Sequence, residues 1–251
     1  MNVTEHRRAL LSEYTPWMFR DYVMNQGLST AIVVSLIGVI MLLPLTQATA
    51  TQLGHVPVDV ARGVLREMAV PLVFLGTLFA TNGIVATDRK LGYYRFLFSK
   101  PVRPPLYYGL TFGVYGVGLI VVTLVLMALW AVVIRPMFPP QLPAVVVIMY
   151  LAYGGLGFLL SAAWRFDWLS LVSVLLVANI AWTLWAKSTS ALHVLLYLLP
   201  PVHRANDIYA LLTQPSYVQP PWISIAWLAG YGLACFVLGL AVIRRRPLGT
   251  S

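Results

Sequence analysis

Six long apolar runs decide what this 251-residue chain can fold into. They lie at about 29–45, 69–87, 109–134, 143–163, 168–186 and 222–243. A bilayer core about 30 Å thick is crossed by a helix of roughly 20 apolar residues, so each run has about the length of one span. With 59% hydrophobic residues and 10% charged ones, the chain has more apolar surface than one soluble core could bury. We therefore predict an all-α membrane protein with six transmembrane helices.

The distribution of Lys and Arg predicts the orientation of these spans. The net charge is +9, but the basic residues lie in short segments between apolar runs, which is typical of topology determinants and not of a nucleic-acid site. Twelve of the 17 fall on the side that holds both ends of the chain. The positive-inside rule then places both termini in the cytoplasm. The chain divides into a cytoplasmic N-terminus at 1–28, a six-helix transmembrane domain at 29–243 and a basic cytoplasmic tail at 244–251.

The N-terminal segment is predicted to contain a helix that lies in the cytoplasmic interface. Thr15 can cap this helix, with Pro16 in its first turn. Its apolar face would be formed by Tyr14, Trp17, Met18 and Tyr22. The alternative is that this segment is simply the start of a longer first span. Pro44 is expected to end that span.

A short amphipathic helix is predicted in the cytoplasmic loop between spans two and three. Apolar and aromatic side chains recur there at helical spacing, at Leu91, Tyr94, Leu97 and Phe98. Basic residues surround them, and the prolines from Pro101 onward end the helix. Such a helix is suited to docking a partner at the membrane surface. Anchoring to lipid headgroups through the same basic residues is the alternative, and both can hold together.

A broken hairpin is predicted on the outer side, between spans five and six. The apolar piece at 192–199 is too short to span, Pro200 and Pro201 interrupt it, and a second amphipathic piece follows at 205–212. Backbone that enters the membrane in this way has to be covered by protein or to line an aqueous cavity. An oligomer interface is expected to supply that cover.

Polar residues within the spans are few, and they concentrate in spans two and five. They are Thr77, Thr81 and Asn82 in the second span, and Ser173, Asn179 and Thr183 in the fifth, with Trp182 beside the last two. They either line a transport pathway or make hydrogen bonds between helices worth about 0.6 kcal/mol each. The glycines of spans three and four are expected to permit close helix packing: Gly113, Gly116, Gly118, Gly154, Gly155 and Gly157.

Several kinds of chemistry find no residues to support them. The chain has no G-x-x-x-x-G-K-[ST] sequence that could cradle nucleotide phosphates, and no H-E-x-x-H zinc pattern. None of the four histidines lies inside an expected span, and the middles of the spans hold no acidic residue of the kind that ion-coupled carriers use. We therefore predict no catalytic residue, no metal site and no cofactor bound by this chain.

The loop after span two resembles a known family. Residues 88–92, DRKLG, followed by 96–102, FLFSKPV, resemble the cytoplasmic loop of type-2 ABC transporter (ABC-2) exporter permeases. The layout of spans, interfacial helix, broken outer hairpin and basic tail is similar over essentially the whole chain. Two departures are Tyr93, where the family usually has threonine, and the run Arg103-Pro104-Pro105. They leave the subfamily, and with it the substrate, open.

The resemblance implies a permease subunit with separate partners. Two permease chains, identical or related, would enclose a pathway lined by spans two and five, in a prokaryotic inner or plasma membrane. Two copies of a P-loop ATPase subunit would bind ATP and Mg and dock on the loop helix. The docking residues implied are Asp88, Arg89, Leu91, Gly92, Tyr94, Arg95 and Phe98. Two alternatives are a non-catalytic membrane subunit of another multi-protein complex and, with less support, an intramembrane enzyme that acts on lipid.

Overall fold

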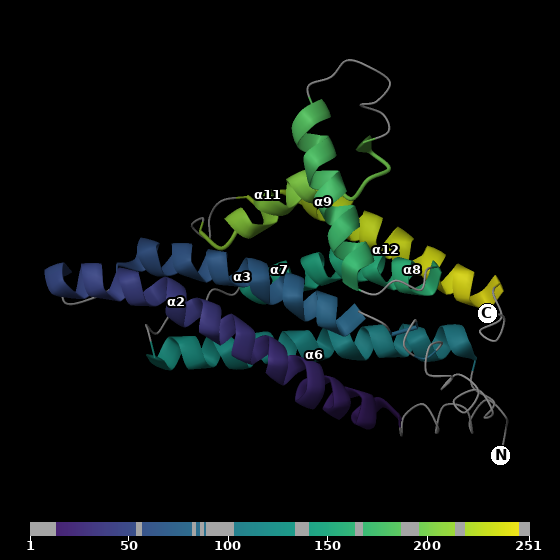
Figure 1. Ribbon diagram of the computed structural model, residues 1–251, viewed down its shortest axis with the longest axis horizontal. Helices are drawn as coiled ribbons and strands as arrows, with labels where there is room; N and C mark the ends of the chain where they lie inside the picture. Colours follow the sequence, from purple (N-terminus) through teal and green to yellow (C-terminus); the bar gives the residue numbers. More distant parts are fainter. Residues whose placement is uncertain are drawn as a thin grey trace.

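The structure is a computed structural model that describes residues 14–53, 57–81, 84–85, 88, 103–133, 141–163, 168–186, 196–213 and 219–245 (Figure 1). The regular elements of these residues are all helical. They are η1 (Tyr22–Gly27), α2 (Leu28–Leu53), α3 (Val58–Thr81), α6 (Pro104–Val133), α7 (Gln141–Met149), η2 (Tyr150–Gly154), α8 (Gly155–Ala163), α9 (Trp168–Trp185), η3 (Val202–Arg204), α11 (Ala205–Ala210) and α12 (Trp222–Arg245). The predicted all-α class is confirmed for this part of the chain.

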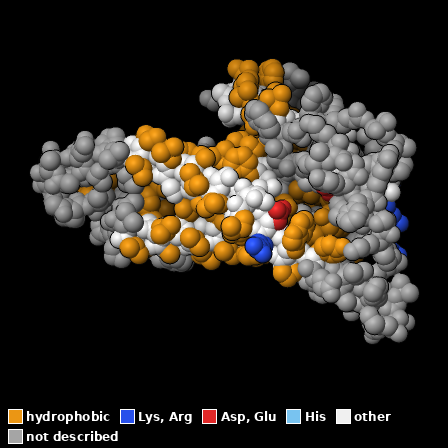
Figure 2. Space-filling model, turned by 60° about the horizontal axis from the view of Figure 1, so that its bottom comes forward, with side chains coloured by type: hydrophobic (Ala, Val, Ile, Leu, Met, Phe, Trp, Pro, Cys, Tyr) orange, Lys and Arg blue, Asp and Glu red, His pale blue; other side chains and the backbone are white. Residues whose placement is uncertain are grey.

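Five helices are long and apolar enough to cross a membrane. They are Tyr14–Ile40, Val60–Thr81, Pro104–Val132, Gln141–Ala163 and Trp222–Arg245. Figure 2 shows a face on which hydrophobic side chains dominate the described surface and charged groups are isolated. The chain is therefore a multi-pass helical membrane protein. The starts of the first span and of α6 lie at the same end of the bundle as the end of α12 (Figure 1). The orientation of that end toward the cytoplasm stays a prediction.

The first span begins earlier and ends later than the sequence predicts. The helix is continuous from Tyr14 through η1 to Leu53, which matches the alternative of a long first span. The expectation that Pro44 ends it is wrong, because α2 continues through that residue. Prolines are tolerated inside membrane helices, and α3 contains Pro71 in the same way. Met18 and Tyr22 of the predicted apolar face are buried, whereas Trp17 is exposed. Whether this first part lies in the lipid interface stays a prediction.

A π-helical turn keeps the buried stripe of this first helix on one face. The stripe runs through Met18, Tyr22, Gly27, Thr30 and Val34, all of them buried. In an α-helix such residues recur every three or four positions, but the step from Tyr22 to Gly27 is five. That step is η1, whose wider turn accommodates one extra residue. A second π-helical turn, η2, lies between α7 and α8 and begins and ends in the same way, with tyrosine and glycine.

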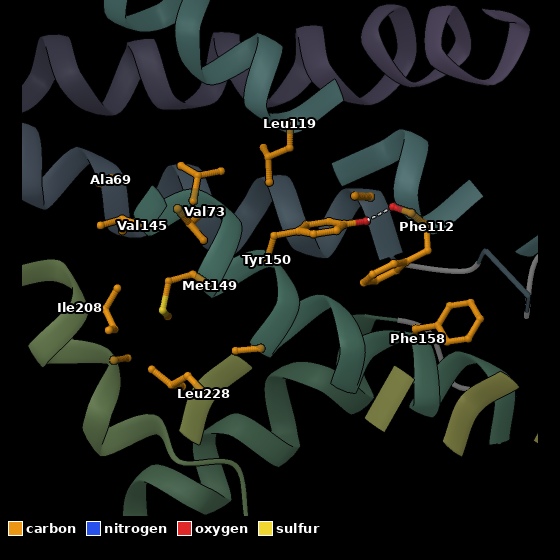
Figure 3. Packing of buried hydrophobic residues seen from close by; sticks show 14 of the residues in the cluster. Ala69, Val73, Phe112, Leu119, Val145, Met149, Tyr150, Phe158, Ile208 and Leu228 are labelled. Atoms are coloured by element: carbon orange, nitrogen blue, oxygen red, sulfur yellow. Dashed lines mark hydrogen bonds between the residues drawn. The ribbon is translucent and has the colours of Figure 1, made fainter. Parts of the chain in front are cut away.

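The core is built around the fourth span, which consists of α7, η2 and α8. Figure 3 shows the Tyr150 ring beside Leu119 and Phe112 of α6. Met149 points to the other side, toward Ile208 of α11 and Leu228 of α12. The Tyr150 hydroxyl donates to the carbonyl oxygen of Phe112 at 2.7 Å. The Phe112 ring stacks on Phe236 of α12 with ring centroids 4.5 Å apart. Aromatic contacts of this kind join the third, fourth and sixth spans.

Glycines permit the closest helix contacts, as predicted, at five of the six expected positions. A Cβ atom on Gly116 would lie 2.7 Å from the Tyr150 ring, and one on Gly118 would overlap the Tyr22 ring. Gly154 and Gly157 face the Thr77 and Thr81 side chains of α3, and Gly155 faces the backbone of α12. At Gly113, in contrast, no neighbouring atom lies within 4 Å of the Cβ position. Small residues of this kind allow membrane helices to approach closely.

The fifth apolar run does not join the bundle as a sixth parallel span. It forms α9, whose apolar part is shorter than that of the five candidate spans. Figure 1 shows α9 standing roughly crosswise to the long helices. Its first turn packs through Leu171 against Leu78 and Leu156, and Trp182 near its other end contacts the segment around η3. The prediction that the fifth run crosses the membrane, which would bring the number of spans to six, is therefore not confirmed.

The broken hairpin before α12 packs on its own chain. Its described part runs from 196 to 213; residues 192–195 of the predicted apolar piece lie outside the described residues. Pro200 and Pro201 separate its two pieces, as predicted, and α11 buries Ile208 and Tyr209 against the core (Figure 3). The expectation that an oligomer interface covers this hairpin is therefore corrected for α11, because α3, α7 and α12 of the same chain cover its apolar side.

Candidate functional site

The predicted docking segment is represented in the structure by Asp88. The other implied docking residues, Arg89, Leu91, Gly92, Tyr94, Arg95 and Phe98, lie outside the described residues. The Asp88 carboxylate accepts a hydrogen bond from the Tyr108 hydroxyl at 3.1 Å. Tyr108 is fully buried near the start of α6. The chain that follows the second span is thereby tied to the beginning of the third.

Burial changes the chemistry of this carboxyl group. Removal from water raises the pKa of Asp88 from 3.8 to about 6, and the hydrogen bond from Tyr108 opposes the rise. The buried environment favours the neutral acid, whereas the Tyr108 hydroxyl favours the carboxylate. Asp88 consequently changes charge about two pH units higher than an ordinary aspartate. Its part in docking a partner stays a prediction, but the contact that it makes in this chain is internal.

The predicted pathway residues of the second span face the interior of the bundle. Thr77 and Thr81 are buried, and their methyl groups lie against Gly154 of the fourth span. The Thr81 hydroxyl donates to the Thr77 carbonyl oxygen at 2.9 Å. Within the described part of the chain, the Thr77 hydroxyl has no hydrogen-bond partner. Asn82 lies outside the described residues. This geometry places the two threonines at a helix–helix contact.

The predicted pathway residues of the fifth span lie on its exposed side. Ser173, Asn179 and Thr183 of α9 are all exposed, and the Thr183 hydroxyl donates to the Asn179 carbonyl oxygen at 2.8 Å. The Asn179 side-chain amide has no hydrogen-bond partner among the residues described. Trp182, three residues after Asn179, is buried. The structure thus gathers three polar residues on one face of α9 and separates them from Thr77 and Thr81.

An aromatic and basic cluster beside α9 was not predicted from the sequence. The Trp182 ring lies 3.8 Å from the His203 ring and 5.9 Å from that of Tyr197, measured between centroids. Arg204 and Trp227 complete the cluster. Burial lowers the pKa of His203, and the Arg204 charge lowers it further, against a smaller opposing effect of Asp207. The density of Trp and Tyr around the outer hairpin is the sequence signal that could have identified this cluster.

One hollow among the described residues is too small for a substrate. A hollow between α2, α3, α6 and α7 has a volume of about 20 Å³, and its lining is almost wholly apolar. About 10–15 Å³ is needed for a single water, so this hollow is far below the size of a substrate pocket. Among the residues that the structure describes, no three His, Cys, Asp or Glu side chains gather into a metal site.

The arrangement of this chain is that of a helical bundle with one helix, α9, largely outside it. The exposed side of α9, with Ser173, Asn179 and Thr183, is accessible to a partner within the membrane. The Asp88–Tyr108 contact lies at the start of the loop that a soluble partner could bind. No protein-family model, no curated protein and no solved structure matches the chain. What the helices themselves identify is a multi-pass helical membrane protein.

Proposed function

We propose that this chain is the membrane-spanning permease subunit of an ATP-driven exporter of the ABC-2 type. Two permease chains would work with two separate P-loop ATPase subunits, which would bind ATP and Mg. The loop sequence at 88–102 and the layout of spans support this proposal. The structural observation that carries it is the exposed side of α9, where the Asn179 side chain has no hydrogen-bond partner among the described residues.

The exposed side of α9 carries Ser173, Asn179 and Thr183 among large apolar side chains, and Asn179 is better suited to protein or water than to lipid. An asparagine amide in hydrocarbon loses its hydrogen bonds with water, so such residues in membrane helices face other helices or aqueous cavities. Asn179 carries both a donor and an acceptor, so a second copy related by a two-fold axis could pair with it. Two α9 helices that face each other would line a central pathway with Ser173, Asn179 and Thr183.

The Asp88–Tyr108 contact supports a coupling role for the loop that follows it. A partner that pushes on a loop can move a span only where loop and span are physically connected. The 3.1 Å hydrogen bond supplies such a connection between the first residue of the implied docking set and α6. In the proposed complex Asp88 holds the loop in place, and Arg89, Leu91, Tyr94, Arg95 and Phe98 contact the ATPase.

The test is to purify the chain from its native membrane in mild detergent and to identify its partners by mass spectrometry. We expect a P-loop ATPase in stoichiometric amount. The double variant Tyr94→Ala/Phe98→Ala should lose that subunit while it still inserts in the membrane. Trp17→Ala is the matched control, because Trp17 is an exposed aromatic residue on the same, predicted cytoplasmic side of the membrane.

The alternative function makes a different prediction for the same experiment. A non-catalytic subunit of another membrane complex would copurify with other proteins and without an ATPase. That result, or an ATPase that remains bound in the Tyr94→Ala/Phe98→Ala variant as firmly as in the Trp17→Ala control, would contradict the docking role of the loop.

A further inference from the structure

Three aromatic rings from three separate segments meet beside η3. Trp182 comes from α9, Tyr197 from the segment before η3, and Trp227 from α12. The ring centroids of Trp182 and Tyr197 are 5.9 Å apart, and those of Tyr197 and Trp227 are 6.0 Å apart. Both pairs meet edge to face, the favoured geometry for aromatic contacts. These contacts fix the relative position of the three segments.

Arg204 supplies the positive charge of this cluster. Its guanidinium carbon lies 6.0 Å from the centroid of the Trp227 ring, at the limit of a cation–π contact. His203, next to it, stacks on Trp182, and burial together with the Arg204 charge lowers its pKa. His203 is therefore mainly neutral at pH 7, and it can act as a hydrogen-bond donor or acceptor.

The arginine has no anionic partner in the described part of the chain. Its Nε atom is shielded from solvent and has no hydrogen-bond partner among the described residues. The carboxylate nearest along the chain, Asp207, accepts a hydrogen bond from the Ser224 hydroxyl at 2.7 Å instead. A partly buried guanidinium without a counter-charge is costly, because its lost hydration is not replaced. The terminal guanidinium nitrogens are not shielded in this way, so an anion from outside the chain can approach the charge there.

The surroundings of Arg204 indicate where such an anion comes from. Leu198, Trp222 and Ile223 lie near it in the sequence or in the first turn of α12, and they are 74%, 68% and 75% exposed. Large apolar side chains with this exposure at the start of a membrane helix are typical of residues in contact with lipid. Tryptophans concentrate at the level of the lipid headgroups. Arg204 lies beside Trp227 of α12, so its charge is close to this end of the membrane helix.

We propose that Arg204, flanked by His203 and Trp227, binds the phosphate group of an anionic membrane lipid at the start of α12. The guanidinium fork donates two hydrogen bonds to the phosphate oxygens, a geometry that arginine favours. The exposed rim formed by Leu198, Trp222 and Ile223 lies against the acyl chains. The site is far from the basic end of α12, where Arg244 and Arg245 are exposed. It does not rest on the proposed exporter function.

Native mass spectrometry of the purified chain in detergent can measure this binding. The probes are dioleoyl-phosphatidylglycerol and dioleoylglycerol, which have the same acyl chains and differ in the phosphate headgroup. We expect retention of the phosphatidylglycerol and not of the dioleoylglycerol. Arg204→Gln should lower the retained phosphatidylglycerol about tenfold, the loss expected for one charge-assisted pair of hydrogen bonds. Arg204→Lys keeps the charge but not the planar guanidinium group. It should retain less phosphatidylglycerol than the unchanged chain and more than Arg204→Gln.

Arg66→Gln is the matched control, because Arg66 is a partly exposed arginine of α3 that makes no aromatic contact among the described residues. Its retention of phosphatidylglycerol should equal that of the unchanged chain. Competition by inorganic phosphate distinguishes the two sources of the anion. If millimolar inorganic phosphate displaces phosphatidylglycerol from the unchanged chain, the site recognises the phosphate group itself. If it does not, binding needs the acyl chains of the lipid as well. Equal retention of dioleoylglycerol, or equal loss in Arg66→Gln and Arg204→Gln, would overturn the proposal.

Discussion

The helices α8, α12 and α9 all consist mainly of apolar residues. However, α8 and α12 pack closely against each other, whereas α9 leaves most of its side chains exposed. At the α8–α12 contact the backbones approach so closely that a Cβ atom on Gly155 or Gly232 would overlap a carbonyl oxygen of the facing helix. Along α9, in contrast, Leu176, Val177, Ile180 and Leu184 are exposed and no glycine occurs. Small residues bring membrane helices together, since lipid competes with large apolar side chains on nearly equal terms.

This comparison separates what the chain holds by itself from what it leaves to its surroundings. The glycine contact joins the fourth and sixth spans without any other molecule. Among the described residues, the face of α9 that carries Asn179 makes no comparable contact. Substitutions on the two helices should therefore affect different properties, and three predictions follow from that distinction.

The largest effect is expected from Gly232→Leu. Its side chain would meet the backbone of Leu151 and Ala152, which cannot move aside by a change of rotamer. We expect the free energy of unfolding in detergent to fall by about 3 kcal/mol or more. Gly230→Leu is the control on the same helix, because no atom lies within 4 Å of its Cβ position. It should change stability by less than about 1 kcal/mol. Equal effects of the two substitutions would show that the contact is not formed.

An intermediate effect, dependent on pH, is expected from Asp88→Asn at the edge of the packed region. The folded pKa of about 6 lies above the ordinary value of 3.8, so the folded state binds the proton more tightly than the unfolded state. The contribution of Asp88 to stability is thus complete below about pH 4 and is lost as the pH rises through about 6. Asp88→Asn should remove this slope, worth at most about 3 kcal/mol. Thermal unfolding measured from pH 4 to 8 checks it, and an unchanged slope would contradict the burial of the carboxyl group.

The smallest effect on the single chain is expected from Asn179→Leu. The side chain is exposed on α9, so the free energy of unfolding should change by less than about 0.5 kcal/mol. Self-association in a bilayer, measured by energy transfer between labelled chains, should weaken about threefold, the equivalent of one membrane hydrogen bond. Ile180→Leu, on the same exposed side, should change neither quantity. A marked loss of folding stability in Asn179→Leu would mean that this face packs within the chain.

The sequence predicted the class of the protein and the glycines at close helix contacts, because both depend on local patterns. Five of the six predicted spans correspond to long apolar helices, and the glycines of spans three and four lie at close contacts at all positions but Gly113. The continuation of the first helix through Pro44 was not predictable from the residue alone, because a membrane helix tolerates the hydrogen bond that proline omits. The effect of a proline depends on its neighbours in space.

The candidate site was less predictable, because it depends on which helices meet. Thr77 and Asn179 are both polar residues within apolar runs, but the first is buried against the fourth span and the second is exposed on α9. A single helical run does not reveal which of its faces is covered. The cluster of Arg204 with Trp227 was missed for the same reason, since it joins segments that only the fold brings together.

The two π-helical turns have a mechanical consequence for α6. Tyr22 of one turn rests on Gly118, and Tyr150 of the other rests on Gly116. These two glycines are two positions apart, so they lie on nearly opposite sides of the helix. Because the Tyr22 and Tyr150 rings contact α6 on opposite sides, a rotation of α6 about its own axis would displace both rings. The two contacts therefore join α6 to the first span on one side and to the fourth span on the other.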